Sequence, residues 1–172
     1  MSKHLGQEES ENSFLVFRLG SEYYATPLLQ VREVVEKQIP KQVPNTADSY
    51  LGVINIRGEI VGAIDLRIKF GQEPIRTETE ALIVFETEHG VLAALADQLE
   101  GVYQISPSSI KPKPNIESNI PIDFIIAMAN FKHHILTIID LHKILTVDEI
   151  TLNLKEHIST SQKLESGEKN HE

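Results

Sequence analysis

The segment LGVINIRGEIVGAIDLRIKFG, residues 51–71, restricts the possible folds more than any other part of this sequence. Two short runs of β-branched and aliphatic residues flank Arg57-Gly58-Glu59, a pattern typical of a β-hairpin with a glycine turn. After the second run, Asp65 is a suitable N-cap for a short helix, and Gly71 is a suitable residue to end it. The segment therefore predicts a strand, a turn, a second strand and a capped helix, in that order.

The same order of elements recurs in the second half of the chain. An offset of 68 residues aligns Phe17 with Phe85, and an offset of 75 aligns Ile64-Asp65-Leu66 with Ile139-Asp140-Leu141. The difference between the offsets falls in loop regions, where insertions are tolerated. A duplication of this kind predicts two small, similar β-barrels or sheets packed together, with the cleft between them as the natural binding surface.

The remaining segments extend this plan. Residues 28–37 fit a helical stripe as well as a strand, and their β-branched residues favour a strand after one turn. Residues 1–13 are expected to be a disordered leader, and 146–172 a C-terminal helix with a polar tail. Between them, 14–80 and 81–145 are the approximate bounds of two intertwined subdomains. Further strands are predicted at 14–19, 22–26, 81–85, 91–96, 99–105, 121–131 and 134–139.

Composition narrows the class of partner. The chain has 25 acidic and 16 basic residues and a net charge of −9, which opposes attraction to nucleic acid and to anionic membranes. It has no cysteine, so a disulfide, a thiolate metal site and a cysteine nucleophile are excluded. No apolar run approaches the length of a membrane span. These features predict a cytoplasmic protein without nucleic-acid binding or membrane insertion.

Motifs for catalysis or metal binding are scarce. Asp65 and Asp140 occupy equivalent places in the repeat, as in an aspartic-protease dyad, but each is better explained as a helix cap. The seven histidines have no carboxylates at ligand spacing, and there is no phosphate-binding glycine loop and no nucleophile elbow. We therefore expect no enzyme activity, no cofactor and no metal, which leaves a binding or scaffolding role.

Arg57 is the polar residue that stands out, because it lies at the predicted hairpin turn beside Asn55 and Gly58. In one interpretation, Asn55 and Gly58 only make the turn and Arg57 is solvated. In the other, the rigid turn holds Arg57 for a carboxylate, for which Glu33 is a candidate. The residues alone leave both interpretations open.

The sequence resembles the CheW family of chemotaxis coupling proteins. Besides the 51–71 segment, the resemblance rests on FLVFRLGSEYYATPLLQVREVVEK, VPNTADSYLGVINIRG and IIAMANFKHHILTIIDLHKIL, and it covers Phe14 to about Leu145. It implies a mainly β fold of two five-stranded, SH3-like barrels with a hydrophobic core between them. It also implies a non-enzymatic adaptor that joins the cytoplasmic tips of methyl-accepting chemoreceptors to the regulatory domain of the histidine kinase CheA.

Carried over by position, the resemblance also implies a receptor-binding surface and an ion pair. The surface would include Val31, Gly52, Asn55, Arg57 and Gly58, and Glu33 would pair with Arg57. The kinase contacts would use the ends of both barrels, without assignment to residues. Alternatives are an adaptor of a non-flagellar pathway, the adaptor half of a CheV-like protein, or a β-barrel that binds small ligands.

Overall fold

A computed structural model describes residues 12–74, 77–87, 90–113 and 122–144, in which the strands form two mixed sheets. Sheet A has six strands, and their order across the sheet is β8-β1-β2-β11-β10-β9. In chain order these strands are β1 (Ser13–Leu19), β2 (Glu22–Pro27), β8 (Gln98–Gln104), β9 (Lys111–Pro112), β10 (Ile125–Phe131) and β11 (His134–Ile139).

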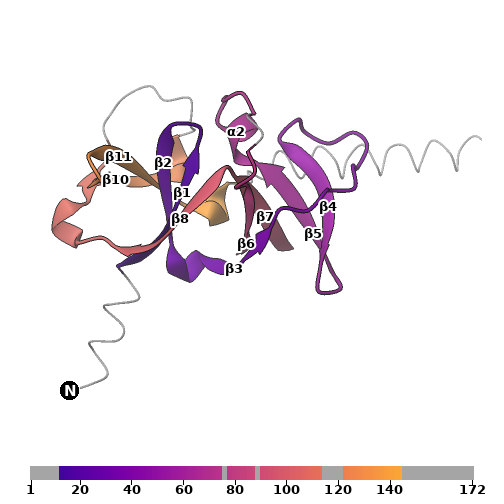
Figure 1. The fold of residues 1–172 in the computed structure, drawn as a ribbon, viewed down its shortest axis with the longest axis horizontal. Coiled ribbons are helices and arrows are strands. Elements are labelled where there is room, and N and C mark those ends of the chain that lie inside the picture. The colour runs from indigo at the N-terminus through magenta and orange to yellow at the C-terminus, as the bar shows by residue number, and fades with distance from the viewer. Residues whose placement is uncertain (1–11, 75–76, 88–89, 114–121, 145–172) are drawn as a thin grey trace, which may run out of the picture.

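Sheet B has five strands in the order β3-β6-β7-β5-β4. They are β3 (Val31–Glu36), β4 (Tyr50–Ile56), β5 (Glu59–Asp65), β6 (Ala81–Thr87) and β7 (Gly90–Ala96). Neighbouring strands are antiparallel except for β5 with β7, and in sheet A the only parallel pair within the described residues is β11 with β2. Figure 1 shows the two sheets side by side along the long axis of the molecule.

Short helices connect the strands. Helix α2 spans Leu66–Lys69, and the 3₁₀ helices are η1 (Leu28–Gln30), η2 (Pro107–Ser109), η3 (Ile122–Phe124) and η4 (Leu141–Lys143). The predicted caps are present, because Asp65 accepts the Arg67 N–H and Asp140 accepts the His142 N–H through their carboxylates. The 28–37 segment is one turn followed by a strand, as its β-branched residues favoured. None of the described helices is long and apolar enough to cross a membrane.

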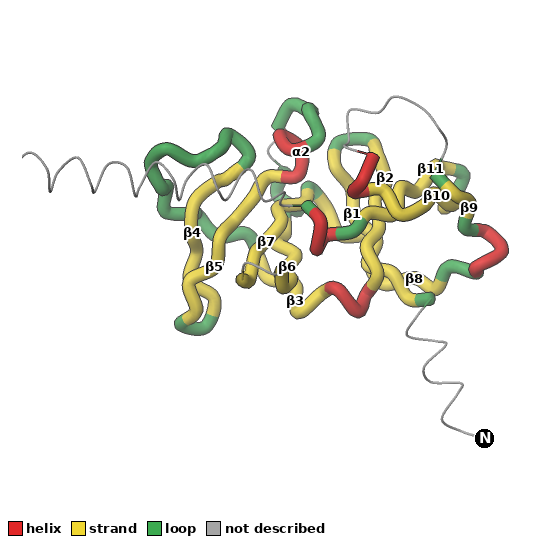
Figure 2. Tube along the Cα trace, turned by 180° about the vertical axis from the view of Figure 1, so that it is seen from behind, coloured by secondary structure: helices red, strands yellow, loops and turns green. Residues whose placement is uncertain are grey.

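The duplication is visible in the strand bounds and in the topology. Strands β1, β2 and β3 correspond to β6, β7 and β8 at the offset of 68, and β4 and β5 correspond to β10 and β11 at the offset of 75. Each sheet combines the first two strands of one repeat with the later strands of the other, which are β3, β4 and β5 in sheet B and β8 to β11 in sheet A. Residues 14–80 and 81–145 therefore each contribute strands to both sheets. Figure 2, the view from behind, shows the β4–β5 hairpin on the outer side of sheet B.

The core has three parts. Phe14, Val16 and Leu136 belong to a cluster within sheet A, and Ile54 and Val84 belong to a cluster within sheet B. The largest cluster lies between the sheets and takes residues from both. Its members from the strands include Leu15, Phe17, Tyr24, Ile64, Ile83 and Phe85. The mainly β fold with a core between two similar halves agrees with the prediction.

Some predictions concern residues that the structure does not describe. The helix expected within 146–172 and most of the expected leader lie outside the described ranges, and Ser13, the last residue of that leader, begins β1. The two-residue strand β9 was not predicted, because Lys111-Pro112 has no strand signal of its own and pairs only through its contact with β10.

Candidate functional site

The turn between β4 and β5 presents Arg57 on the surface. Arg57 and Gly58 both have positive φ, 52° and 91°, as the two-residue turn favoured by twisted hairpins requires. The Asn55 side-chain oxygen accepts a hydrogen bond from the Gly58 N–H at 2.8 Å. Asn55 and Gly58 thus build the turn from which Arg57 projects.

Arg57 forms an ion pair that reaches from the β4–β5 turn to β3, the strand at the other end of sheet B. Its Nη2 lies 3.0 Å from Oε2 of Glu33 on β3, and the side chains are 82% and 19% exposed, respectively. The arginine is thus paired and exposed at the same time, which combines the two interpretations that the sequence left open. Because solvent screens so exposed a charge, the pair adds little stability, and its effect is to orient the guanidinium.

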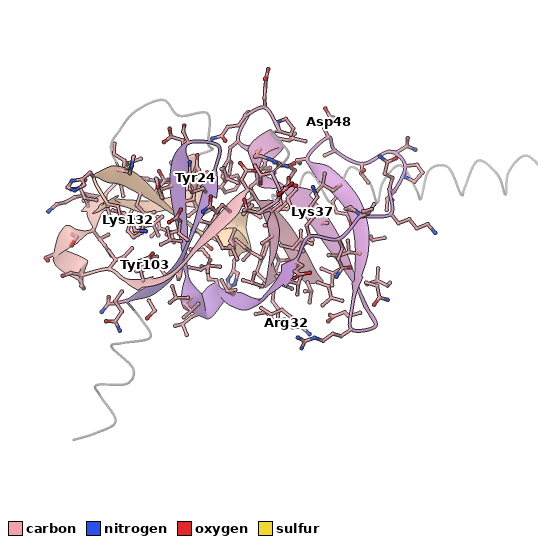
Figure 3. The ribbon with its side chains drawn as sticks, in the orientation of Figure 1. Tyr24, Arg32, Lys37, Asp48, Tyr103 and Lys132 are labelled. Carbon is pink, nitrogen blue, oxygen red and sulfur yellow. The ribbon has the colours of Figure 1, made fainter. Side chains whose placement is uncertain are left out.

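A second ion pair runs alongside the first in the opposite sense. Arg32 on β3 contacts Glu59 at the start of β5 at 2.9 Å, and Figure 3 shows Arg32 beside the β4–β5 hairpin. The hydrogen bond to Glu59 and the charge of that carboxylate raise the pKa of Arg32 above its ordinary value. Strands β3 and β4 are the two ends of sheet B, without a ladder between them in the described structure. We call these two ion pairs, which join β3 to the β4–β5 hairpin, the hairpin seam.

The other residues expected at this surface differ in exposure. Val31 is partly buried against the central core, and a shift in the β3–β6 register follows it, so that Val31 pairs with Phe85 and Glu33 pairs with the adjacent Val84. Gly52 is buried, with φ 125°, and a Cβ placed there would lie 2.2 Å from the Lys41 carbonyl oxygen. Gly52 therefore allows the connection before β4 to pack on the strand and offers no side chain to a partner.

The turn between β10 and β11 repeats the arrangement in sheet A. Lys132 and His133 have φ 47° and 68°, and Lys132 Nζ lies 3.2 Å from a Glu100 carboxylate oxygen and 3.1 Å from the Tyr103 hydroxyl. The same ammonium lies 5.1 and 4.9 Å from the ring centroids of Tyr103 and Phe131. Figure 3 shows Lys132 and Tyr103 in the sheet A part of the molecule.

The site residues Lys132 and Glu100 were missed from the sequence. The signal was available, because the offset of 75 places Lys132 opposite Arg57 and His133 opposite Gly58. The echo of residues 55–58 in 130–133 is only partial in the sequence, because Lys-His has no glycine and so does not look like the same turn. The structure shows that each hairpin carries a cation at its turn, and that each cation bonds a glutamate on another strand of its sheet.

A buried charge cluster lies at the start of α2. The Arg67 side chain is 4% exposed, and its Nε and Nη2 donate to the two oxygens of Asp65 at 2.9 and 2.7 Å. Its Nη1 donates to Glu80 at 3.0 Å and to Asp97 at 2.6 Å. These bonds, first of all those to Asp65, raise the pKa of Arg67 above its ordinary value despite burial. We call these four residues the Arg67 cluster.

The sequence predicted only the capping role of Asp65 in this cluster. An arginine in the first turn of a short helix is ordinarily exposed. Its burial depends on Glu80 and Asp97, which β6 and β7 bring from distant parts of the chain, and on Lys37, which bonds the second oxygen of Glu80. No local sequence pattern predicts such a cluster.

Neither cap aspartate has the surroundings of a catalytic carboxylate. Asp65 is held by Arg67, and Asp140 accepts hydrogen bonds from the Gln30 side chain and the His142 N–H. Within the described ranges, no three histidine or acidic residues gather where they could hold a metal ion. The two hairpin turns and their ion pairs are exposed and have fixed geometry, an arrangement suited to protein contacts.

Comparison with known proteins gives a consistent result. The family model described as the CheW-like domain matches residues 13–149. Chemotaxis protein CheW of Klebsiella aerogenes is 30% identical over 149 residues, 86% of this chain and 90% of that protein. Chemotaxis protein CheW of Helicobacter pylori is 33% identical over 117 residues, 66% and 70% of the two chains. The crystal structure of scaffolding protein TtCheW from Thermoanaerobacter tengcongensis aligns with a TM-score of 0.74 at 28% identity, covering 81% of this chain and 90% of that one.

Proposed function

This chain belongs to the CheW family, and from that membership we propose that it is a chemotaxis adaptor, without catalytic activity of its own, that couples chemoreceptors to the histidine kinase CheA. It would work in the cytoplasm, associated with receptors in the membrane through their cytoplasmic tips. The kinase would bind through its regulatory domain, to which the family resemblance gives the same fold.

The observation that carries the proposal is the hairpin seam. Arg57 is exposed, yet its turn and Glu33 fix its direction, so its charge can set the register of a partner. We propose that the receptor tip, a helical hairpin, contacts Val31, Asn55, Arg57 and Gly58, with Val31 as the apolar contact. The buried Gly52 would shape this surface indirectly, through the packing of Lys41 on β4.

The proposed interfaces suit an array. A helical hairpin that meets one edge of a small sheet buries a modest area and binds weakly by itself. Many linked copies raise the effective concentration of each contact, so the assembly is stable although single contacts exchange. An adaptor of this kind needs well-oriented surface groups more than a deep pocket.

The test is a pull-down of the full chain with CheA and with a receptor cytoplasmic fragment, separately and together. We expect binding to each and a three-component complex when all are mixed. Arg57→Glu should weaken the receptor interaction, whereas Lys111→Glu, the same charge reversal on exposed β9, should not. Failure of the unmodified chain to bind either partner would contradict the proposal. The receptor that binds would identify the pathway as flagellar or of another type.

A further inference from the structure

Among the described strands, the chain passes from one sheet to the other at two places, which we call crossovers. The first is η1, between β2 of sheet A and β3 of sheet B, and the second is the β7–β8 link at Asp97. All other links between consecutive strands stay within one sheet. The relative orientation of the sheets therefore depends on how these two crossovers are held and on the core between the sheets.

Gln30 anchors the first crossover. Its side-chain oxygen accepts hydrogen bonds from the Leu141 N–H at 3.0 Å and the Thr26 hydroxyl at 3.1 Å. Its Nε2 donates to Asp140 Oδ1 at 2.9 Å. Asp140 is the cap that follows β11, so Gln30 ties the crossover to the helix cap of sheet A, the sheet that the chain is leaving.

Asp97 anchors the second crossover in an equivalent way. Its Oδ1 accepts from Arg67, which is bound to Asp65, the cap that follows β5 in sheet B. Its Oδ2 accepts the Gly20 N–H of the β1–β2 turn at 2.6 Å. The second crossover is therefore also tied to the cap of the sheet that the chain is leaving.

The two anchors occupy related places in the repeat but use different chemistry. The offset of 75 relates Asp65 to Asp140, and the offset of 68 places Gln30 opposite Gln98, next to Asp97. One anchor is a neutral amide at a partly buried position, and the other is a buried ionic cluster. Gln30 can be removed without leaving a buried charge unpaired, which makes it the anchor that can be tested in a folded protein.

We propose that Gln30 is a positioning residue that fixes the angle between the two sheets, and that this angle is what the adaptor transmits between its partners. Each sheet has a core cluster of its own, so loss of Gln30 leaves the sheets intact and changes their relation. The part about transmission rests on the proposed function. The part about the angle does not.

The angle is measured by electron paramagnetic resonance distances in the full chain without partners. Because the chain has no cysteine, Glu36→Cys and Gln104→Cys introduce the only two labelling sites. Both positions are exposed, and they are equivalent in the repeat, one on β3 and one on β8. The matched control is Gln98→Ala, since the Gln98 side chain makes no hydrogen bond within the described part of the chain.

We expect one narrow distance distribution for the otherwise unmodified chain and for Gln98→Ala, and a shifted or broadened one for Gln30→Ala. Gln30→Met, which keeps the side-chain volume, should have the same effect and replaces the alanine variant if that fails to fold. An unchanged distribution in a folded Gln30 variant would overturn the proposal. With partners present, Gln30→Ala should bind receptor fragment and kinase separately yet lose receptor control of kinase activity. Retained control would overturn the transmission part, whereas loss of binding by the unmodified chain would instead refute the adaptor function.

Discussion

Arg57 and Lys132 lie 75 residues apart in the sequence, and each is the first residue of a two-residue hairpin turn. Arg57 reaches Glu33 at 3.0 Å, and Lys132 reaches Glu100 at 3.2 Å. Glu33 lies on the end strand β3 of sheet B, and Glu100 lies on the end strand β8 of sheet A. The cations are equivalent in the repeat, whereas the glutamates are not, because the offset of 68 places Glu33 opposite Gly101.

Charge at the first turn should matter more for binding than for folding. Arg57→Glu should weaken binding of a receptor fragment about tenfold, or about 1.4 kcal/mol, because it reverses the oriented charge and repels Glu33. Its thermal unfolding midpoint should stay near that of the unmodified chain, since the side chain is exposed. Titration calorimetry and circular dichroism measure the two effects. Unfolding of the variant would show that Arg57 is structural.

Removal of Arg67, in contrast to the change at Arg57, should reduce the stability of the fold. Arg67→Met leaves three buried carboxylates with only Lys37 to compensate, so we expect a loss of about 3–5 kcal/mol in the free energy of unfolding. Urea denaturation followed by circular dichroism measures it, with Arg57→Ala as the exposed-arginine control. A loss no larger than in that control would mean that the buried carboxylates find other partners.

A substitution in the β10–β11 turn should increase the stability of the protein. His133 has φ 68°, where its equivalent in the first turn is Gly58, and an L-residue is strained in that region. His133→Gly should therefore stabilise the protein by about 0.5–1 kcal/mol after the extra entropy of glycine in the unfolded chain is subtracted. Gly58→His should destabilise it by a similar amount. Equal unfolding midpoints for both variants would refute the strain.

Gly52 should not tolerate a methyl group. In Gly52→Ala the Cβ would lie 2.2 Å from the Lys41 carbonyl oxygen, so the connection before β4 must move, at a cost of about 3 kcal/mol. Gly71→Ala is the matched control, because Gly71 also has positive φ but nothing lies within 4 Å of its Cβ position. Chemical denaturation should show a clearly larger loss for Gly52→Ala, and equal losses would mean that the Lys41 segment yields easily.

The buried Tyr24 phenol should ionise only at strongly alkaline pH. Burial, with the nearby charge of Glu22, raises the pKa of Tyr24 to about 12. In the unfolded chain the Tyr24 phenol ionises near pH 10. The contribution of the neutral phenol to the stability of the folded protein is therefore complete below about pH 10 and is lost as the pH rises toward about 12. Near-ultraviolet absorbance of the folded protein should show a late phenolate step that Tyr24→Phe reduces. Tyr50, whose pKa burial also raises, remains in that variant. An unchanged late step would assign it to another tyrosine.

The features that local sequence could predict are those set by neighbouring residues. The hairpin with Gly58 and the caps at Asp65 and Asp140 follow from residues within a few positions of one another. Which strands the two halves exchange could not be predicted, because nothing in the sequence of a strand identifies its partner strand in the other half of the chain. The same reason hid the burial of Arg67, because its partners Glu80 and Asp97 lie just before β6 and just after β7.

The exchange of strands also says something about the unit that was duplicated. Strands β1 and β2 of the first repeat complete the sheet of the second, and β6 and β7 return the exchange. A single repeat on its own would have either to fold its first hairpin back onto itself or to trade it with another copy, and the second course is a domain-swapped homodimer. The present chain has the form of such a dimer joined end to end. Its crossovers correspond to the hinge loops of such a swap, and within one chain the exchange of strands is intramolecular.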